Sequence, residues 1–173
     1  MIKKKKGVSS KFILPDLAIL DPLLTTNLPA NITASTGIDA MVHAIEAFTS
    51  INSNNNPVSK MLSIEALKLL GSSIKTAVFD GHNINARSNM LLGSMLAGKA
   101  FANSPVAAVH ALAYPIGGLF NISHGLSNSL VLTSVMKFNS KNEKTKKNYA
   151  HLAPYVFKNL DNSKNDEFLC NNF

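Results

Sequence analysis

The stretch VHALAYPIGGLFNISHGL, residues 109–126, decides how this chain folds and what chemistry it can support. It contains two histidines, His110 and His124, which are separated by a Gly117–Gly118 pair. Tyr114 follows His110 at the spacing of one helical turn, so the two side chains share a helix face. An apolar segment with two spaced imidazoles is a candidate site rather than plain core.

Residue types around this stretch predict where its helix begins and ends. Ser104 followed by Pro105 is typical of a helix start, so we expect the helix to begin there. A residue before proline disfavours helix, and paired glycines favour a helix end. We therefore expect the helix to stop between Tyr114–Pro115 and the glycine pair. A loop over residues 121–125 then presents His124.

A second stretch, GIDAMVHAIEAFTS at residues 37–50, matches the first one in kind. Its apolar residues recur at helical spacing, which predicts a helix over residues 29–50. Asp39 and His43 are four residues apart, so both side chains point to the same side of that helix. With His110 and His124, this pair makes a set of three imidazoles and one carboxylate.

One carboxylate and three neutral imidazoles form a donor set that suits iron, zinc or nickel. Spacing alone leaves a second interpretation open, because a single histidine is more often a core or surface residue than a ligand. His110 is the hardest to dismiss, since it lies among alanines. Burying an imidazole there without a partner costs about 1–3 kcal/mol.

The rest of the chain predicts a mainly α domain. Residues 11–20 are apolar with Pro15 inside them, which favours a short strand or an extended lead-in. Asn56–Pro57 is typical of a helix start. We expect further helices over residues 57–78, 85–102, 126–138 and 142–158, and an irregular tail over 159–173.

Composition excludes several functional classes. The net charge of +7 comes largely from lysines near both ends, including Lys3–Lys6, which are typical of solvated termini. With no tryptophan and no continuous basic face we expect no nucleic-acid partner. We expect no signal peptide and no membrane span. One cysteine, Cys170, allows no internal disulfide and favours a reducing, cytoplasmic setting.

The two stretches resemble the metal-binding signatures of the iron-containing (group III) alcohol dehydrogenases. LPDLAILDPLLTTNLP and MLLGSMLAGKAFANSPVAAVHALAYP follow the order of that family as well. The resemblance covers about residues 14–152. It implies the helical, dehydroquinate-synthase-like domain of those enzymes, which we assign to residues 29–158. It also implies that residues 1–28 are a remnant of the α/β nucleotide-domain edge with its linker.

By resemblance, the metal is Fe2+ or Zn2+, and its ligands are Asp39, His43, His110 and His124. The family implies an NAD(P)-linked oxidoreductase that interconverts a small-molecule alcohol with an aldehyde or ketone. Phe101 stands where similar enzymes line the substrate channel, although an ordinary core phenylalanine explains it equally well. Tyr114 stands where many members carry a histidine that relays the alcohol proton, and a phenol is a poorer relay at neutral pH.

The chain also departs from the family pattern, because it has no glycine-rich nucleotide loop and no helices after the expected last one. We therefore expect a fragment whose activity is impaired. A non-catalytic metal-binding or interaction module is the main alternative, with self-association through exposed apolar surfaces. A metal-dependent hydrolase is a third hypothesis, with Glu46 as its only candidate base; a solvated helix residue is the more ordinary interpretation of Glu46.

Overall fold

A computed structural model describes residues 10–13, 15–105, 107–157, 159–161 and 163–173. Residues 1–9, which include the cluster Lys3–Lys6 and belong to the expected nucleotide-domain remnant, lie outside the described residues. The described part is mainly α, as predicted. Its elements are the 3-10 helices η1 (Lys11–Ile13) and η2 (Pro22–Thr25) and the helices α1 (Ala30–Thr49), α2 (Pro57–Phe79), α3 (Ile84–Asn103), α4 (Ala108–Phe120), α5 (His124–Asn139), α6 (Glu143–Val156) and α7 (Asp166–Asn171).

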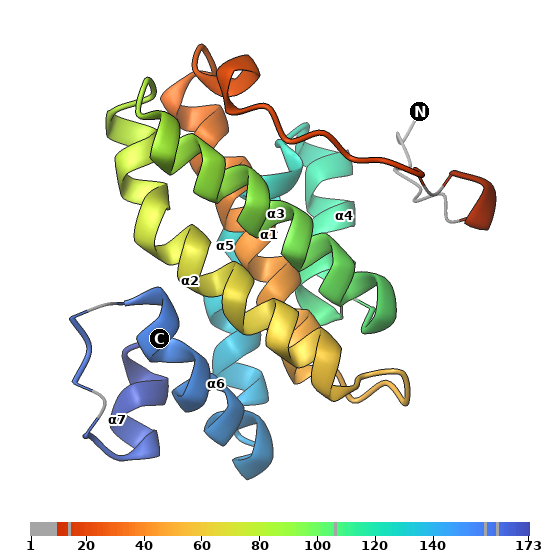
Figure 1. The fold of residues 1–173 in the computed structure, drawn as a ribbon. Coiled ribbons are helices and arrows are strands. Elements are labelled where there is room, and N and C mark those ends of the chain that lie inside the picture. The colour runs from red at the N-terminus through yellow and green to blue at the C-terminus, as the bar shows by residue number, and fades with distance from the viewer. Residues whose placement is uncertain (1–9, 14, 106, 158, 162) are drawn as a thin grey trace.

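Helix α1 runs through the middle of the bundle (Figure 1). It packs against α2 and α3 on one side and against α5 on the other, and α4 pairs with α5. Helices α6 and α7 lie together beside α2, next to the C-terminus. The described residues before η2 form an arm that leads away from the bundle. No described helix is both long enough and apolar enough to cross a membrane.

Side chains at helix starts fix several boundaries. Asn56 accepts hydrogen bonds from the backbone of Val58 and Ser59, and Ser59 bonds back to Asn56. This capping box, with Pro57 in the first turn, starts α2 where the sequence predicts it. Asn83 and Asn142 cap α3 and α6 by accepting a hydrogen bond from the backbone N–H of Ala86 and of Thr145.

Two apolar clusters hold α1 in place. The larger one joins Ile45 and Phe48 of α1 to Leu67 and Leu70 of α2 and to Leu152 of α6. Each fully buried leucine contributes about 1.5–3 kcal/mol relative to exposure. A smaller cluster joins Val42 of α1, Val109 of α4 and Val135 of α5. This second cluster fixes α4 and α5 against the α1 segment that carries Asp39 and His43.

The expected strand before the bundle is wrong. Residues 11–13 form η1, and the part of residues 15–20 that follows is irregular and exposed, including Leu17 and Ile19. No strand occurs in the described ranges, so the segment has no neighbouring strand to pair with. The alternative prediction, an extended lead-in, describes residues 15–20 correctly (Figure 1).

The predicted limits of the fourth helix are also wrong. Ser104 is the C-cap of α3, and its hydroxyl donates to Ser59 on α2; the residue before α4 is Ala107, so Ser104 does not cap α4, which begins at Ala108. Helix α4 then continues through Pro115 to Phe120 and ends at Asn121, whose φ of 54° is left-handed. The glycine pair stays within the helix because α4 packs along α5. His124 is therefore the first residue of α5 rather than part of a loop.

The expected irregular tail contains a short helix. Asn165 caps α7 by accepting a hydrogen bond from Phe168 N–H at 2.9 Å. Leu169 is buried against Ala150 and Ala153 of α6, and Phe173 packs on the same cluster. Three apolar residues at the end of the chain are too few to show a helical period, but α6 gives them a surface to cover.

Candidate metal centre

Helix α1 places three functional groups on one face. Asp39, His43 and Glu46 are separated by four and three residues, so the helical period brings them to the same side. His43 Nδ1 lies 2.8 Å from the Asp39 carbonyl oxygen. A carbonyl only accepts, so Nδ1 carries the hydrogen and the lone pair is left on Nε2.

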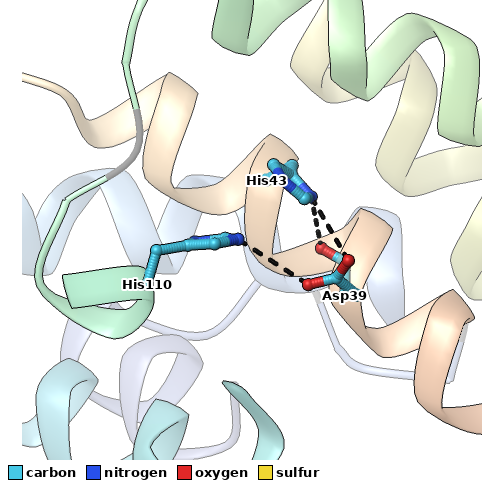
Figure 2. Close-up of side chains that lie close together, drawn as sticks. All are labelled: Asp39, His43 and His110. Atoms are coloured by element: carbon cyan, nitrogen blue, oxygen red, sulfur yellow. Dashed lines mark hydrogen bonds and ion pairs between the residues drawn. The ribbon is translucent and has the colours of Figure 1, made fainter. Parts of the chain in front are cut away.

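His110 reaches the same place from α4. Its Nε2 lies 3.6 Å from Asp39 Oδ1, and its ring centroid lies 4.4 Å from that of His43. Figure 2 shows the two imidazoles converging on the Asp39 carboxylate. One ligand atom from each of Asp39, His43 and His110 falls within 4.8 Å of the others, which is close enough to share one metal ion.

His124 joins this cluster from the start of α5. Its Nε2 also lies 3.6 Å from Asp39 Oδ1, and its ring lies 5.3 Å from that of His110. It is the most exposed of the three histidines, with a third of its side chain accessible. The structure thus brings together all four residues that the sequence singled out, with Asp39 as their common neighbour.

The separations fit a tetrahedral cation. Ligand atoms that each bond a metal at about 2.1 Å lie about 3.4 Å apart in that geometry. The 3.6 Å distances from Asp39 Oδ1 to His110 Nε2 and to His124 Nε2 are close to this value. A set of imidazole nitrogens with one carboxylate and no thiolate favours a catalytic rather than a structural metal. The donor types and these two separations therefore fit a divalent iron or zinc ion.

Burial and neighbouring charged groups shift the pKa values of Asp39, His43 and His110. Burial alone would raise the pKa of Asp39, but the hydrogen bond with His110 and the charges of His43 and His124 hold it below its ordinary value. Burial and the charge of His110 lower the pKa of His43. Burial would also lower the pKa of His110, but the hydrogen bonds to Asp39 and Glu46 outweigh it and raise that pKa to about 9. A metal must therefore displace a proton from this cluster.

Glu46 is a site residue that the sequence interpretation placed in solvent. It is 5% exposed and accepts hydrogen bonds from Val109 N–H and His110 Nδ1–H, each at 2.7 Å. The solvated interpretation is therefore wrong. Its position three residues after His43 was the available signal, because that spacing puts Glu46 on the ligand face of α1.

Asn128 is a second residue that the sequence interpretation missed. It lies in α5 one turn after His124, is fully buried, and donates through Nδ2 to Asp39 Oδ1. The same Nδ2 lies 3.3 Å from Nε2 of His110 and of His124. Its Oδ1 is buried without a hydrogen-bond partner among the described residues. A buried acceptor without a partner is uncommon in folded proteins and is one sign of a site that holds an ion or an ordered water molecule.

Two further candidates lie at the edge of the cluster. Phe101 of α3 is partly buried, and its ring centroid lies 4.9 Å from that of His43. Tyr114 of α4 is 38% exposed, and its ring centroid lies 5.3 Å from that of His124. Each aromatic residue thus covers one ligand imidazole.

Similarity to known proteins agrees with this geometry. Residues 33–170 match the Fe-containing alcohol dehydrogenase family, C-terminal, a range that continues past residue 152, where we expected the resemblance to end. Long-chain-alcohol dehydrogenase 1 of Geobacillus thermodenitrificans is 48% identical over 134 residues, which are 78% of this chain and 33% of that protein. The chain thus spans about a third of the length of the curated relatives it matches.

Solved structures agree in fold as well. The structure of a 1,3-propanediol oxidoreductase has a TM-score of 0.80 and 34% identity over 88% of this chain and 38% of that one. A sulfoacetaldehyde reductase from Bifidobacterium kashiwanohense, in complex with NAD+, has a TM-score of 0.77 and 31% identity over 87% and 39% of the two chains. On the match over residues 33–170, the chain belongs to the Fe-containing alcohol dehydrogenase family and corresponds to its C-terminal region.

Proposed function

We propose that this chain is the metal-binding part of an NAD(P)-linked oxidoreductase that interconverts a small alcohol with an aldehyde or ketone. One observation carries the proposal: the ligand atoms of Asp39, His43 and His110 lie within 4.8 Å of one another, and His124 Nε2 lies 3.6 Å from Asp39 Oδ1. We assign Asp39, His43, His110 and His124 as ligands of Fe2+ or Zn2+. The dehydrogenase names of the relatives support this choice of reaction.

A divalent metal bound there supplies Lewis-acid character toward an alcohol or carbonyl oxygen, and a nicotinamide supplies the hydride chemistry. The chain's own residues would bind the metal and set the shape of the site around it. Asp39 contributes negative charge, and His43 and His110 present Nε2 lone pairs because their Nδ1 atoms face other acceptors. The relative solved with NAD+ supports a nicotinamide as the second cofactor.

The two aromatic residues have supporting roles in this proposal. Phe101 covers His43 and supplies an apolar wall against which the substrate carbon chain packs. Tyr114 lies against His124, with its side chain partly open to solvent. We assign its hydroxyl to proton exchange between the site and water. In this role it replaces the histidine that many family members carry at this position, which is the better proton relay.

The hydrolase hypothesis loses its base in this geometry. Both Glu46 oxygens accept hydrogen bonds from α4, so this carboxylate is not free to activate a water molecule. A general base must reach the proton that it removes. The non-catalytic metal-binding module shares the same ligands, and only an activity measurement distinguishes it from the dehydrogenase.

Metal analysis of the purified chain tests the site. We expect about one iron or zinc ion per chain, and its loss in His110→Ala and in His124→Ala. The second variant changes a partly exposed side chain, so it keeps the test valid if His110→Ala does not fold. A folded wild-type chain that binds no more metal than the variants would overturn the metal centre. Metal binding without alcohol-dependent NADH formation would overturn catalysis by this chain and support the module.

A further inference from the structure

Glu46 is a buried carboxylate whose two oxygens serve different partners. Oε1 accepts from the Val109 backbone N–H and Oε2 accepts from His110 Nδ1–H, both at 2.7 Å. Neither a lysine nor an arginine pairs with it among the described residues. A carboxylate that is 5% exposed needs such partners, because burying an unpaired charge is very costly.

The bond to His110 decides which ring nitrogen faces the metal cluster. An ionised carboxylate only accepts, so it holds the hydrogen on Nδ1. Nε2 then points toward Asp39 Oδ1, 3.6 Å away, and its lone pair becomes available when a metal displaces the hydrogen on that nitrogen. In known metal sites, a carboxylate behind a histidine fixes the tautomer and the ring orientation in this manner.

The bond to Val109 fixes where α4 begins. The residue before α4, Ala107, has no side chain that can cap the helix. One of the free N–H groups of the first turn is instead satisfied by Glu46, from a helix distant in sequence. The negative charge also suits the positive end of the α4 dipole. Because Val109 and His110 are adjacent, the two bonds fix both the backbone and the ring of this ligand.

We propose that Glu46 is a positioning residue of the metal centre, which sets the tautomer of His110 and anchors the start of α4 to α1. The inference rests on the proposed metal site. It assigns to Glu46 neither metal ligation nor proton transfer. Its consequence is that metal affinity depends on a side chain that does not touch the ion.

Zinc binding by Glu46→Gln tests the inference. A glutamine keeps the size of the side chain but cannot accept from both Val109 N–H and His110 Nδ1–H, because one of its two atoms is an NH2 donor. We expect the Kd for Zn2+, measured by competition with a chromophoric chelator, to rise about 10- to 100-fold. Glu65→Gln removes the same charge from an exposed residue of α2 and should stay within about twofold of wild type.

The tautomer of the His110 ring is a second readout, and a purely structural role of Glu46 would not change it. In the zinc-loaded wild type, 15N NMR should show the hydrogen on Nδ1 and the metal at Nε2 of His110. This measurement needs no variant, so it holds even if Glu46→Gln does not fold. The opposite tautomer in the wild type, or an unchanged Kd in a folded Glu46→Gln, would overturn the inference. Failure of the wild type to bind Zn2+ would instead overturn the proposed metal site itself.

Discussion

Gly125 of α5 lies directly against the backbone of Ser35 in α1. A Cβ atom added at Gly125 would lie 2.6 Å from the Ser35 carbonyl carbon and 3.3 Å from its Cα, and even closer to the carbonyl oxygen. Asp39 follows Ser35 by one turn, and His124 precedes Gly125. The close approach of these two backbones therefore brings His124 beside Asp39.

Gly125→Ala should destabilise the fold, because the added methyl meets backbone atoms that cannot rotate away. We expect the free energy of unfolding to fall by about 1–3 kcal/mol, as is usual for overpacking. We also expect weaker Zn2+ binding, since α5 must shift and carry His124 with it. Chemical denaturation and zinc titration of the same preparation measure both effects.

Gly98→Ala is the matched control. A Cβ at Gly98 in α3 meets no atom within 4 Å, and alanine favours a helix over glycine by about 1 kcal/mol. This variant should be as stable as the wild type or more stable. Equal stability of the two alanine variants would show that α1 and α5 do not approach as closely as described.

Arg87→Met should be strongly destabilising. The Arg87 side chain is 2% exposed and donates to Thr33 Oγ1 and to the carbonyls of Gly81 and Leu28. Methionine fills similar space but leaves these acceptors without a donor. We expect a loss of about 2–4 kcal/mol in the free energy of unfolding.

Lys68→Met provides the comparison for that loss. It removes the same charge from an exposed helix pair with Glu65, at 3.2 Å, whose contribution should stay below about 1 kcal/mol. Urea denaturation of both variants measures the difference. If Arg87→Met lost no more than Lys68→Met, the buried guanidinium would not hold α3 to α1 and to the chain at Leu28 and Gly81 as the structure indicates.

Tyr149 should make the fold sensitive to alkali. Burial raises the pKa of its phenol, which is held in the neutral form beside Asn139. The stability that follows from a raised pKa is fully present below the unfolded value, about 10, and is lost as the pH rises through the folded value. Tyr149→Phe has no phenol at this position, so it lacks this pH-dependent loss of stability.

We expect Tyr149→Phe to be less stable than wild type by about 0.5–1.5 kcal/mol at pH 8, because the bond from Asn139 is lost. Above pH 10 this difference should shrink as only the wild type loses stability. Urea denaturation at several pH values measures it. A difference that stays constant up to pH 11 would be inconsistent with a buried neutral phenol.

Metal removal should lower the thermal stability of the wild type. A ligand that binds only the folded chain stabilises it by about 2.7 kcal/mol when present at about 100 times its Kd. We expect Zn2+ to raise the melting temperature and a chelator to reverse the shift. His124→Ala should respond much less, and an equal response in that variant would place the bound ion elsewhere.

The sequence by itself determined the local part of this protein. Helical period and caps such as Asn56–Pro57 gave the positions of α1, α2 and α3, because these signals depend on neighbours a few residues apart. The same period placed Asp39 and His43 on one face. The four candidate ligands could be named because they lie in two short sequence motifs whose residue types and spacing are visible without the structure.

Only the tertiary structure decided which helix faces are covered. Glu46 reads as a solvent-facing residue until α4 supplies Val109 N–H and His110 as its partners. Pro115 reads as a helix end, but α4 continues through it because packing along α5 offsets one missing backbone bond. The burial of a side chain depends on segments far apart in the sequence. A local sequence pattern does not show which of these segments packs against it.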